Sequence, residues 1–347
     1  FVVNQREYLI ESIIEIFNEF YFGDREIISD EKHEILSSMF NVFKYTFDSN
    51  PNDENFNLMK HMAYSFQLYV EKNGTEIVNS SFESQNEQGE ESKQSESKQS
   101  KQNESKQKNQ ITTLLFQNLI QFYDTIYKIV NEIFHNDVEF IQSFSNAFGN
   151  ICNENNHKYT LTQLLPIYCD KILKKGSKLN DYELTEQLSS SFRLFVCLID
   201  KDMFIEYYRD LLSQRLLTKK FLSIDFEKTF ISFLKQQCGS TFTTKLEGMI
   251  NDFITSEDSV CEFNDIFKEY DVNVVYEPLL LTMSNWPSQQ NRNVTLPPIL
   301  NDIQQCFTDW YVTKHNNSRK LSFMHHLGEI TIQSIFGTKK YDFIMTP

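Results

Sequence analysis

The chain has 347 residues, of which 40% are hydrophobic and 23% charged, proportions that are ordinary for a globular protein. Its formal net charge of −15 argues against a nucleic-acid binder, which needs a basic surface for phosphate contacts, and against an anionic membrane surface. No apolar run is long enough to cross a bilayer, so we expect neither nucleic acid nor a membrane among the partners.

The six cysteines are scattered through the sequence, and none of them forms a CxxC pair. Cysteines spaced in this way are typical of reduced thiols that pack as small apolar side chains. Because thiols stay reduced in the cytosol and nucleus, we expect a cytoplasmic and nuclear protein.

Two segments in the first half carry apolar residues at the spacing of amphipathic helices, residues 8–21 and 111–134. The stripe of the second comprises Ile111, Leu115, Leu119, Phe122, Ile126, Ile129 and Ile133. Between the two helical segments, residues 83–110 hold no large apolar side chain and repeat Glu-Ser-Lys-Gln. Such a segment buries too little surface to offset its conformational entropy, so we expect a disordered insertion over residues 83–110.

Further helical stripes follow from residue 183 onward. They comprise Leu184, Leu188, Phe192, Phe195 and Ile199; then Met203, Tyr207, Leu211 and Leu212; then Phe226, Phe230, Phe233 and Leu234; then Leu246, Met249, Ile250 and Phe253; and finally Leu300, Ile303, Phe307 and Trp310.

Several residues mark where these helices begin and end. Ser223 or Asp225 is a predicted N-cap, and Thr244 to Glu247 reads as a capping box. Gly239 is placed to end a helix with positive φ, and Pro298 is placed to begin one.

After Arg319 the apolar period changes from 3.6 to 2, which indicates strands. Apolar and polar residues alternate around Leu321 and Phe323, then Ile330 and Ile332, then Tyr341, Phe343 and Met345. Gly337 and Thr338 form a predicted turn. We therefore expect a mainly α protein of helical bundles that ends in a small antiparallel β-meander, whose free edge could pair with another strand.

The sequence carries no motif for phosphate binding, metal ligation or nucleophilic catalysis: HExxH, a Walker loop, GxGxxG and GxSxG are all missing. His325 and His326 fall in the predicted strand region, where neighbouring side chains point to opposite faces. We expect no cofactor, no metal and no catalytic activity. Six cysteines and seven histidines leave a Cys-dependent hydrolase as an alternative.

Five sequence stretches, in this order, resemble the cullin family. They read LLPIYCDKILKKGSK over residues 164–178, DKDMFIEYYRDLLSQRLL over 200–217, and a stretch over 223–253 that includes CGSTFTTKLEGM; NWP and LPP over 285–298 and KHNNSRKLSF over 314–323 follow. The resemblance implies a last cullin repeat over residues 1–178, a four-helix bundle over 179–315, and the start of an α/β subdomain over 316–347.

The resemblance also implies a function, that of a non-catalytic scaffold in a multisubunit ubiquitin ligase. Such a scaffold holds a substrate-receptor adaptor and a RING-box protein at a fixed distance. The adaptor is expected to bind through an N-terminal part that this chain lacks. The alternatives are a cullin-like subunit of the anaphase-promoting complex and a helical adaptor without a ubiquitin role.

The family binds its RING partner at the α/β subdomain, which makes the meander the candidate site. We expect a strand of the RING-box protein to add to it, with alternate side chains entering partner pockets. The candidate partner-binding residues are Leu321, Phe323, Ile330, Ile332, Tyr341 and Phe343.

Overall fold

The computed structural model describes residues 37–38, 40–42, 44–45, 58–83, 99–154, 159–176, 179–267, 275–287, 294–336 and 339–345. The helix expected over residues 8–21 lies outside the described residues. The chain divides into two compact units, one drawn from Phe1–Ile172 and Asn180–Phe204 and the other from Leu173–Leu179 and Ile205–Pro347. Helices dominate both, and the chain ends in a two-stranded antiparallel sheet, so the predicted fold class is confirmed.

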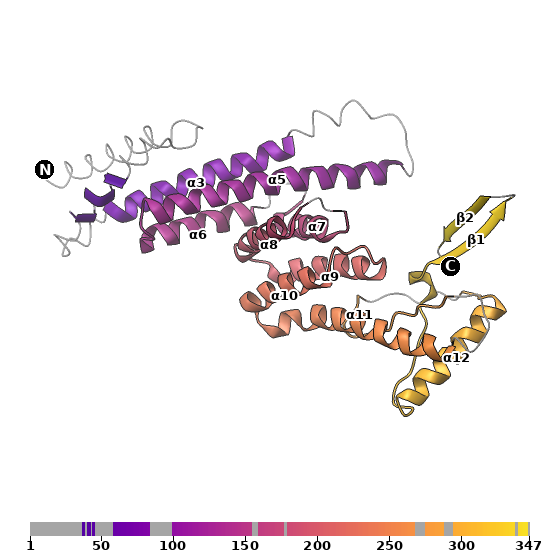
Figure 1. Cartoon of the computed structure of the whole chain (residues 1–347). Coiled ribbons are helices and arrows are strands. Elements are labelled where there is room, and N and C mark those ends of the chain that lie inside the picture. Colours follow the sequence, from indigo (N-terminus) through magenta and orange to yellow (C-terminus); the bar gives the residue numbers. More distant parts are fainter. Residues whose placement is uncertain are drawn as a thin grey trace, which may run out of the picture. The chain divides into compact units, whose positions relative to one another are not determined.

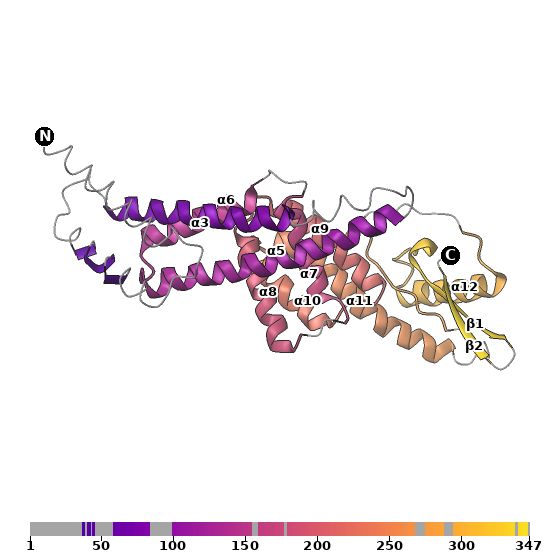
Figure 2. The ribbon, with the colours of Figure 1, turned by 90° about the horizontal axis from the view of Figure 1, so that it is seen from above.

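In the first unit, three long helices lie side by side: α3 (Leu58–Glu83), α5 (Gln99–Glu132) and α6 (Val138–Asn153), as Figures 1 and 2 show. Aromatic side chains form their common core, in which the rings of Phe134 and Phe140 stack with centroids 3.8 Å apart. Phe66 meets Phe134 edge-on at 5.3 Å. The stripe predicted for residues 111–134 is confirmed, since Leu115, Leu119, Ile126, Ile129 and Ile133 are buried.

Helix α3 ends at Glu83 and helix α5 begins at Gln99, so the expectation of disorder over residues 83–110 is wrong for Glu83 and for residues 99–110. The reason is helix propensity: Lys, Gln and Glu are good helix formers. Once the packed turns from Thr112 onward have nucleated the helix, each added residue needs only the favourable propagation step. Residues 84–98 of the same segment lie outside the described residues.

Helices α7 (Leu161–Leu173) and α8 (Asp181–Val196) follow, and a capping box of Asn180 and Glu183 begins α8. Helix α8 packs on α5, where Arg193 Nη1 lies 2.6 Å from Asp124 Oδ1. The compact units therefore place α8 with the first unit, although the sequence places a domain boundary at residue 178. As a boundary between family domains, residue 178 stays a prediction.

The second unit contains α10 (Ile224–Cys238), α11 (Ser240–Phe267) and most of α9 (Lys201–Leu217). Ser223 caps α10 as predicted, because its side chain accepts a hydrogen bond from the backbone N–H of Asp225. Gly239 has the predicted positive φ, 86°. The capping box at Thr244 is wrong: after Gly239 the helix resumes at once, and the Thr244 hydroxyl donates to the carbonyl of Ser240 inside α11.

The apolar stripe predicted for α9 is displaced by one residue. The structure buries Phe204, Tyr208, Leu212 and Leu216, whereas Met203 and Tyr207 are about two-fifths exposed, at 42% and 41%. Farther along, α12 (Pro298–Lys314) has Pro298 in its first turn, as predicted. His325 and His326 lie in a short 3-10 helix, His325–Leu327, and not in a strand; the Gly328 N–H closes this turn on the carbonyl of His325.

Candidate protein-interaction site

A β-hairpin ends the described chain, formed by β1 (Ile330–Phe336) and β2 (Lys339–Met345), as Figure 1 shows. The strands pair antiparallel, with Ile332 opposite Phe343 and Ser334 opposite Tyr341. Because directly opposed residues share a face of the sheet, the register sorts the side chains into two sets. A two-stranded hairpin is only marginally stable by itself in water, so it depends on further contacts.

One set is apolar and is called here the apolar face of the hairpin: Ile330, Ile332, Tyr341, Phe343 and Met345. Its members remain substantially open to solvent, with Ile332 48% and Phe343 46% exposed. The opposite face mixes polar and apolar residues: Thr331, Gln333 and Asp342 lie there with Ile335 and Ile344, which are 64% and 68% exposed. The Gln333 amide donates to Asp342 Oδ1 at 3.0 Å. The hairpin thus exposes apolar side chains on both faces, and the larger apolar set, of the kind that marks a binding site, lies on the face of Ile332 and Phe343.

The outer edges of the hairpin have no strand neighbour among the residues that the structure describes. An edge strand offers a row of backbone N–H and C=O groups, which can pair with a strand of another chain. An open edge beside an apolar face is the geometry that β-strand addition uses.

Four of the six candidate partner-binding residues lie in the hairpin, but Leu321 and Phe323 do not. The chain forms no strand around them, so the predicted meander has two strands among the described residues. Leu321 and Phe323 instead pack against the buried cluster of Phe263, Phe307 and Tyr311 between α11 and α12. Alternation alone could not distinguish a strand from an extended segment whose side chains meet a neighbouring helix.

Just before α12, an extended segment over residues 275–287 is tied to α11 through Asp252 and Ser256. Asp252 Oδ2 accepts from the backbone N–H of Thr282 at 2.8 Å and from Trp286 Nε1 at 2.9 Å. The Ser256 hydroxyl is bonded to both the N–H and the carbonyl of Leu280. These contacts fix the course of the segment that leads into α12.

A charged network that the sequence analysis missed lies buried in the second unit. Arg215 and Glu227 are both fully buried and form two parallel hydrogen bonds, at 2.8 and 2.9 Å. Tyr208 completes the network by donating to Glu227 Oε2 at 2.9 Å. All three side chains are fully buried, so the network joins α9 to α10 and is structural. The sequence did carry a signal, because residues 208, 212 and 215 share a helix face.

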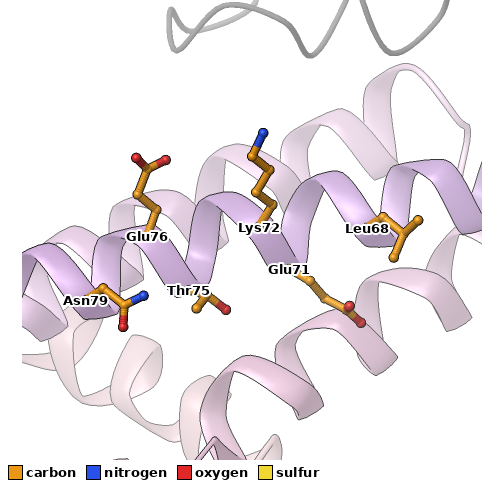
Figure 3. Close-up of a pocket in the computed structure, with 6 residues that line it drawn as sticks. All are labelled: Leu68, Glu71, Lys72, Thr75, Glu76 and Asn79. Carbon is orange, nitrogen blue, oxygen red and sulfur yellow. The ribbon is translucent and has the colours of Figure 1, made fainter. Parts of the chain in front are cut away.

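The described residues also form a depression in the first unit. A shallow depression on α3 is lined by Leu68, Glu71, Lys72, Thr75, Glu76 and Asn79, all from one helix, as Figure 3 shows. Its Glu71 carboxylate already accepts from Gln67 and Asn150. Within the described ranges, no three His, Cys, Asp or Glu side chains gather as metal ligands would. Nor does any helix in that part of the chain have the length and apolarity needed to span a membrane.

An α-helical array followed by a small α+β portion is the class of architecture that these elements define. A family model described as the cullin alpha solenoid domain matches residues 3–260, and one described as the cullin alpha+beta domain matches residues 280–347. The chain therefore belongs to the cullin family.

Similar proteins point the same way. The chain is 27% identical to Cullin-1 of Oryza sativa subsp. japonica over 351 residues, which cover 99% of this chain and 44% of the rice protein. It is 29% identical to Cullin-3 of Dictyostelium discoideum over 323 residues, 91% of this chain and 36% of that protein. The chain spans less than half the length of these relatives.

Proposed function

We propose that the chain is part of a scaffold subunit of a cullin-RING ubiquitin ligase, and that its hairpin receives a strand from the RING-box protein. The single observation that carries the proposal is the hairpin itself, with an apolar face that is nearly half exposed beside edges that have no strand neighbour in the described part of the chain. Membership of the cullin family supports the choice of partner.

Strand addition would satisfy the hydrogen-bonding groups along one edge of the hairpin. It would also bring partner side chains against Ile332, Tyr341 and Phe343, which removes apolar surface from water. The opposite face has fewer apolar side chains, Ile335 and Ile344 beside the polar Gln333 and Asp342, so the partner is expected on the apolar face.

A scaffold acts by holding two partners together, which turns an encounter in solution into an effectively intramolecular step. In this proposal the RING-box protein binds at the hairpin. A substrate-receptor adaptor binds a part of the protein outside this chain, and the chain itself performs no chemistry.

The experiment compares two aspartate substitutions on neighbouring residues of β1. Ile332→Asp places a charge on the apolar face, where the partner would desolvate it, so binding to a RING-box protein is expected to be lost. Thr331→Asp adds the same charge on the opposite face and should leave most of the binding intact. Co-purification of each variant with the RING-box protein is the measurement, after circular dichroism has shown that both are folded.

Two outcomes would contradict the proposal. If folded Ile332→Asp protein binds like the unmodified chain, the strand adds elsewhere and not to the apolar face. If the unmodified chain binds no RING-box protein, the scaffold assignment fails as well.

A further inference from the structure

Two cysteine thiols meet in the first unit, at the C-terminal ends of two helices. Cys152 lies in the last turn of α6 and is only 2% exposed, while Cys197 directly follows α8 and is partly exposed. Both are free, and the Cys152 thiol donates a hydrogen bond to the sulfur of Cys197. The Cys197 thiol in turn donates to the carbonyl of Arg193 at 3.5 Å, a bond that is given up when the thiol ionises.

The backbones that carry these thiols are held together by a third residue, Asn153. Its Nδ2 donates to the carbonyls of Gly149, at 2.6 Å, and of Cys197, at 2.9 Å. Its Oδ1 accepts from the backbone N–H of Ile199 at 2.8 Å. The end of α6 is therefore fastened to the chain around Cys197 independently of the sulfurs, and the two thiols stay close.

The surroundings make the two thiols unequal. The hydrogen bond from Cys152 and the nearby Lys201 ammonium lower the pKa of Cys197, which outweighs its partial burial. That same hydrogen bond, together with full burial, raises the pKa of Cys152 well above the ordinary range. A partly exposed thiol with a lowered pKa, backed by a buried neutral thiol, is the arrangement of an attacking and a resolving cysteine.

We propose that Cys152 and Cys197 form a reversible redox site that hydrogen peroxide oxidises to a disulfide. The Cys197 thiolate attacks one oxygen of the peroxide, the O–O bond breaks, and a sulfenic acid and hydroxide form. The Cys152 sulfur then attacks the sulfenic sulfur, the S–O bond breaks, and the released hydroxide takes the Cys152 proton and leaves as water. In total two thiols lose two electrons and the peroxide is reduced to two waters.

The disulfide would join the end of α6 to the end of α8 and close the loop over residues 153–196. Closing a loop of this length restricts the unfolded chain, so oxidation should stabilise the first unit. A thiol reductant would reverse the effect by exchange.

The test oxidises the reduced 347-residue chain with a small excess of hydrogen peroxide and maps the peptides by mass spectrometry without reduction. A peptide pair joined through Cys152 and Cys197, lighter by two hydrogens and separated again by dithiothreitol, is the expected result. The unmodified chain alone decides the proposal. It is overturned if Cys197 proceeds to sulfinic acid without a cross-link, or if links through Cys261 or Cys306 form equally fast.

Substitutions at the buried position separate the two roles. Cys152→Ser and Cys152→Ala both remove the resolving sulfur, so the Cys197 sulfenic acid should accumulate and be trapped by dimedone. Serine retains a hydrogen-bond donor and should keep the trapping fast, whereas alanine should slow it. Cys197→Ser, at the more accessible position, should abolish both products, and Cys261→Ser on exposed α11 should change neither. Dimedone trapping at Cys152 in Cys197→Ser protein, as fast as trapping at Cys197 in Cys152→Ser protein, would refute the assignment.

Discussion

The side-chain amide of Asn285 lies directly over the α-carbon of Gly248. A β-carbon at Gly248 would come within 2.4 Å of Asn285 Nδ2 and 2.6 Å of its Cγ. The contact joins α11 to the extended segment before α12, one turn away from the Asp252 hydrogen bonds to the same segment. Glycine in the KLEGM stretch therefore leaves room for the Asn285 side chain, which a β-carbon would displace, and it does not serve a positive φ.

Gly248→Ala should destabilise the protein by about 1–3 kcal/mol, because the overlap outweighs the better helix propensity of alanine. Gly149→Ala is the matched control: it also lies inside a helix but has no atom within 4 Å of an added β-carbon, so it should stabilise by about 0.5–1 kcal/mol. Urea unfolding measures both. The double variant Gly248→Ala/Asn285→Ala should recover part of the loss, and no recovery would show that Asn285 is not the obstacle.

Asp252→Asn should loosen the segment over residues 275–287. The carboxylate accepts three hydrogen bonds from Thr282 and Trp286, and an amide can accept on one oxygen only. The expected loss is about 1–3 kcal/mol, accompanied by a red shift of Trp286 fluorescence as that ring gains access to water. Asp258→Asn, an exposed position on the same helix, is the control and should change neither property. An unshifted tryptophan spectrum in Asp252→Asn protein would contradict the prediction.

Removing one member of the buried Arg215–Glu227 pair should lower the free energy of unfolding far more than breaking a surface ion pair of the same length. Arg215→Met leaves the Glu227 carboxylate buried and unpaired, with an expected loss of about 3–5 kcal/mol. Glu277→Gln breaks the exposed pair with Lys219, also 2.8 Å long, and should lose at most about 1 kcal/mol. Denaturant unfolding of the Arg215→Met and Glu277→Gln proteins measures both losses of stability.

The double variant Arg215→Met/Glu227→Leu tests whether the cost arises from the unpaired charge. It should lose less stability than Arg215→Met alone, because no buried charge remains without a partner. A double variant that is as unstable as the sum of the single ones would instead point to lost packing around α9 and α10.

The displaced stripe of α9 shows where sequence patterns stop being sufficient. Periodicity placed the helix correctly, but it favoured Met203 and Tyr207 over Phe204 and Tyr208, since both sets are apolar and one residue apart. The residue that would have identified the buried face of α9 is Arg215, which shares that face with Tyr208 and Leu212. From the sequence alone, an arginine is expected to face solvent. The burial of Arg215 depends on Glu227 from another helix, a pairing that no local pattern reveals.

The candidate partner-binding residues also fall into two groups, those whose conformation the local sequence predicts and those whose conformation depends on distant residues. Ile332 and Phe343 were predicted as strand residues, and they are cross-strand neighbours, because alternation is a local signal that favours both strands. The predicted turn at Gly337 and Thr338 lies outside the described residues. Leu321 and Phe323 alternate as well, but their partners Phe263 and Phe307 come from distant helices, so tertiary packing decides their conformation. The proposal that the partner is a RING-box protein rests on membership of the cullin family. Co-purification of the Ile332→Asp and Thr331→Asp variants with the RING-box protein tests it.

Gly239→Ala should destabilise by roughly 1 kcal/mol, in contrast to the gain expected for Gly149→Ala, because φ at residue 239 is 86° and disfavours a β-carbon. An added β-carbon would meet no atom within 4 Å, so the loss would come from the backbone alone. Thermal unfolding of both variants measures the contrast. A stabilised Gly239→Ala protein would mean that α10 and α11 can join without the left-handed residue.

The pH dependence of Cys197 alkylation reports on the hydrogen bond from Cys152. Because this bond and the Lys201 ammonium favour the thiolate, the pKa of Cys197 is lowered, and its rate with iodoacetamide should reach half of the maximum below the ~8.5 of a free cysteine. Below that midpoint the thiolate is protonated and the rate falls; above it the rate levels off. Cys152→Ala should move the midpoint upward, because the thiolate loses its donor, and Lys201→Met should move it in the same direction by a smaller amount. The midpoint of Cys152→Ser protein should lie between those of the unmodified chain and Cys152→Ala, because the serine hydroxyl can still donate.

Mass spectrometry of the peptide that contains Cys197 gives the rate at each pH, with circular dichroism to show that each variant is folded. A midpoint that stays the same in folded Cys152→Ala protein would mean that the two thiols do not share the hydrogen bond on which their unequal reactivity depends.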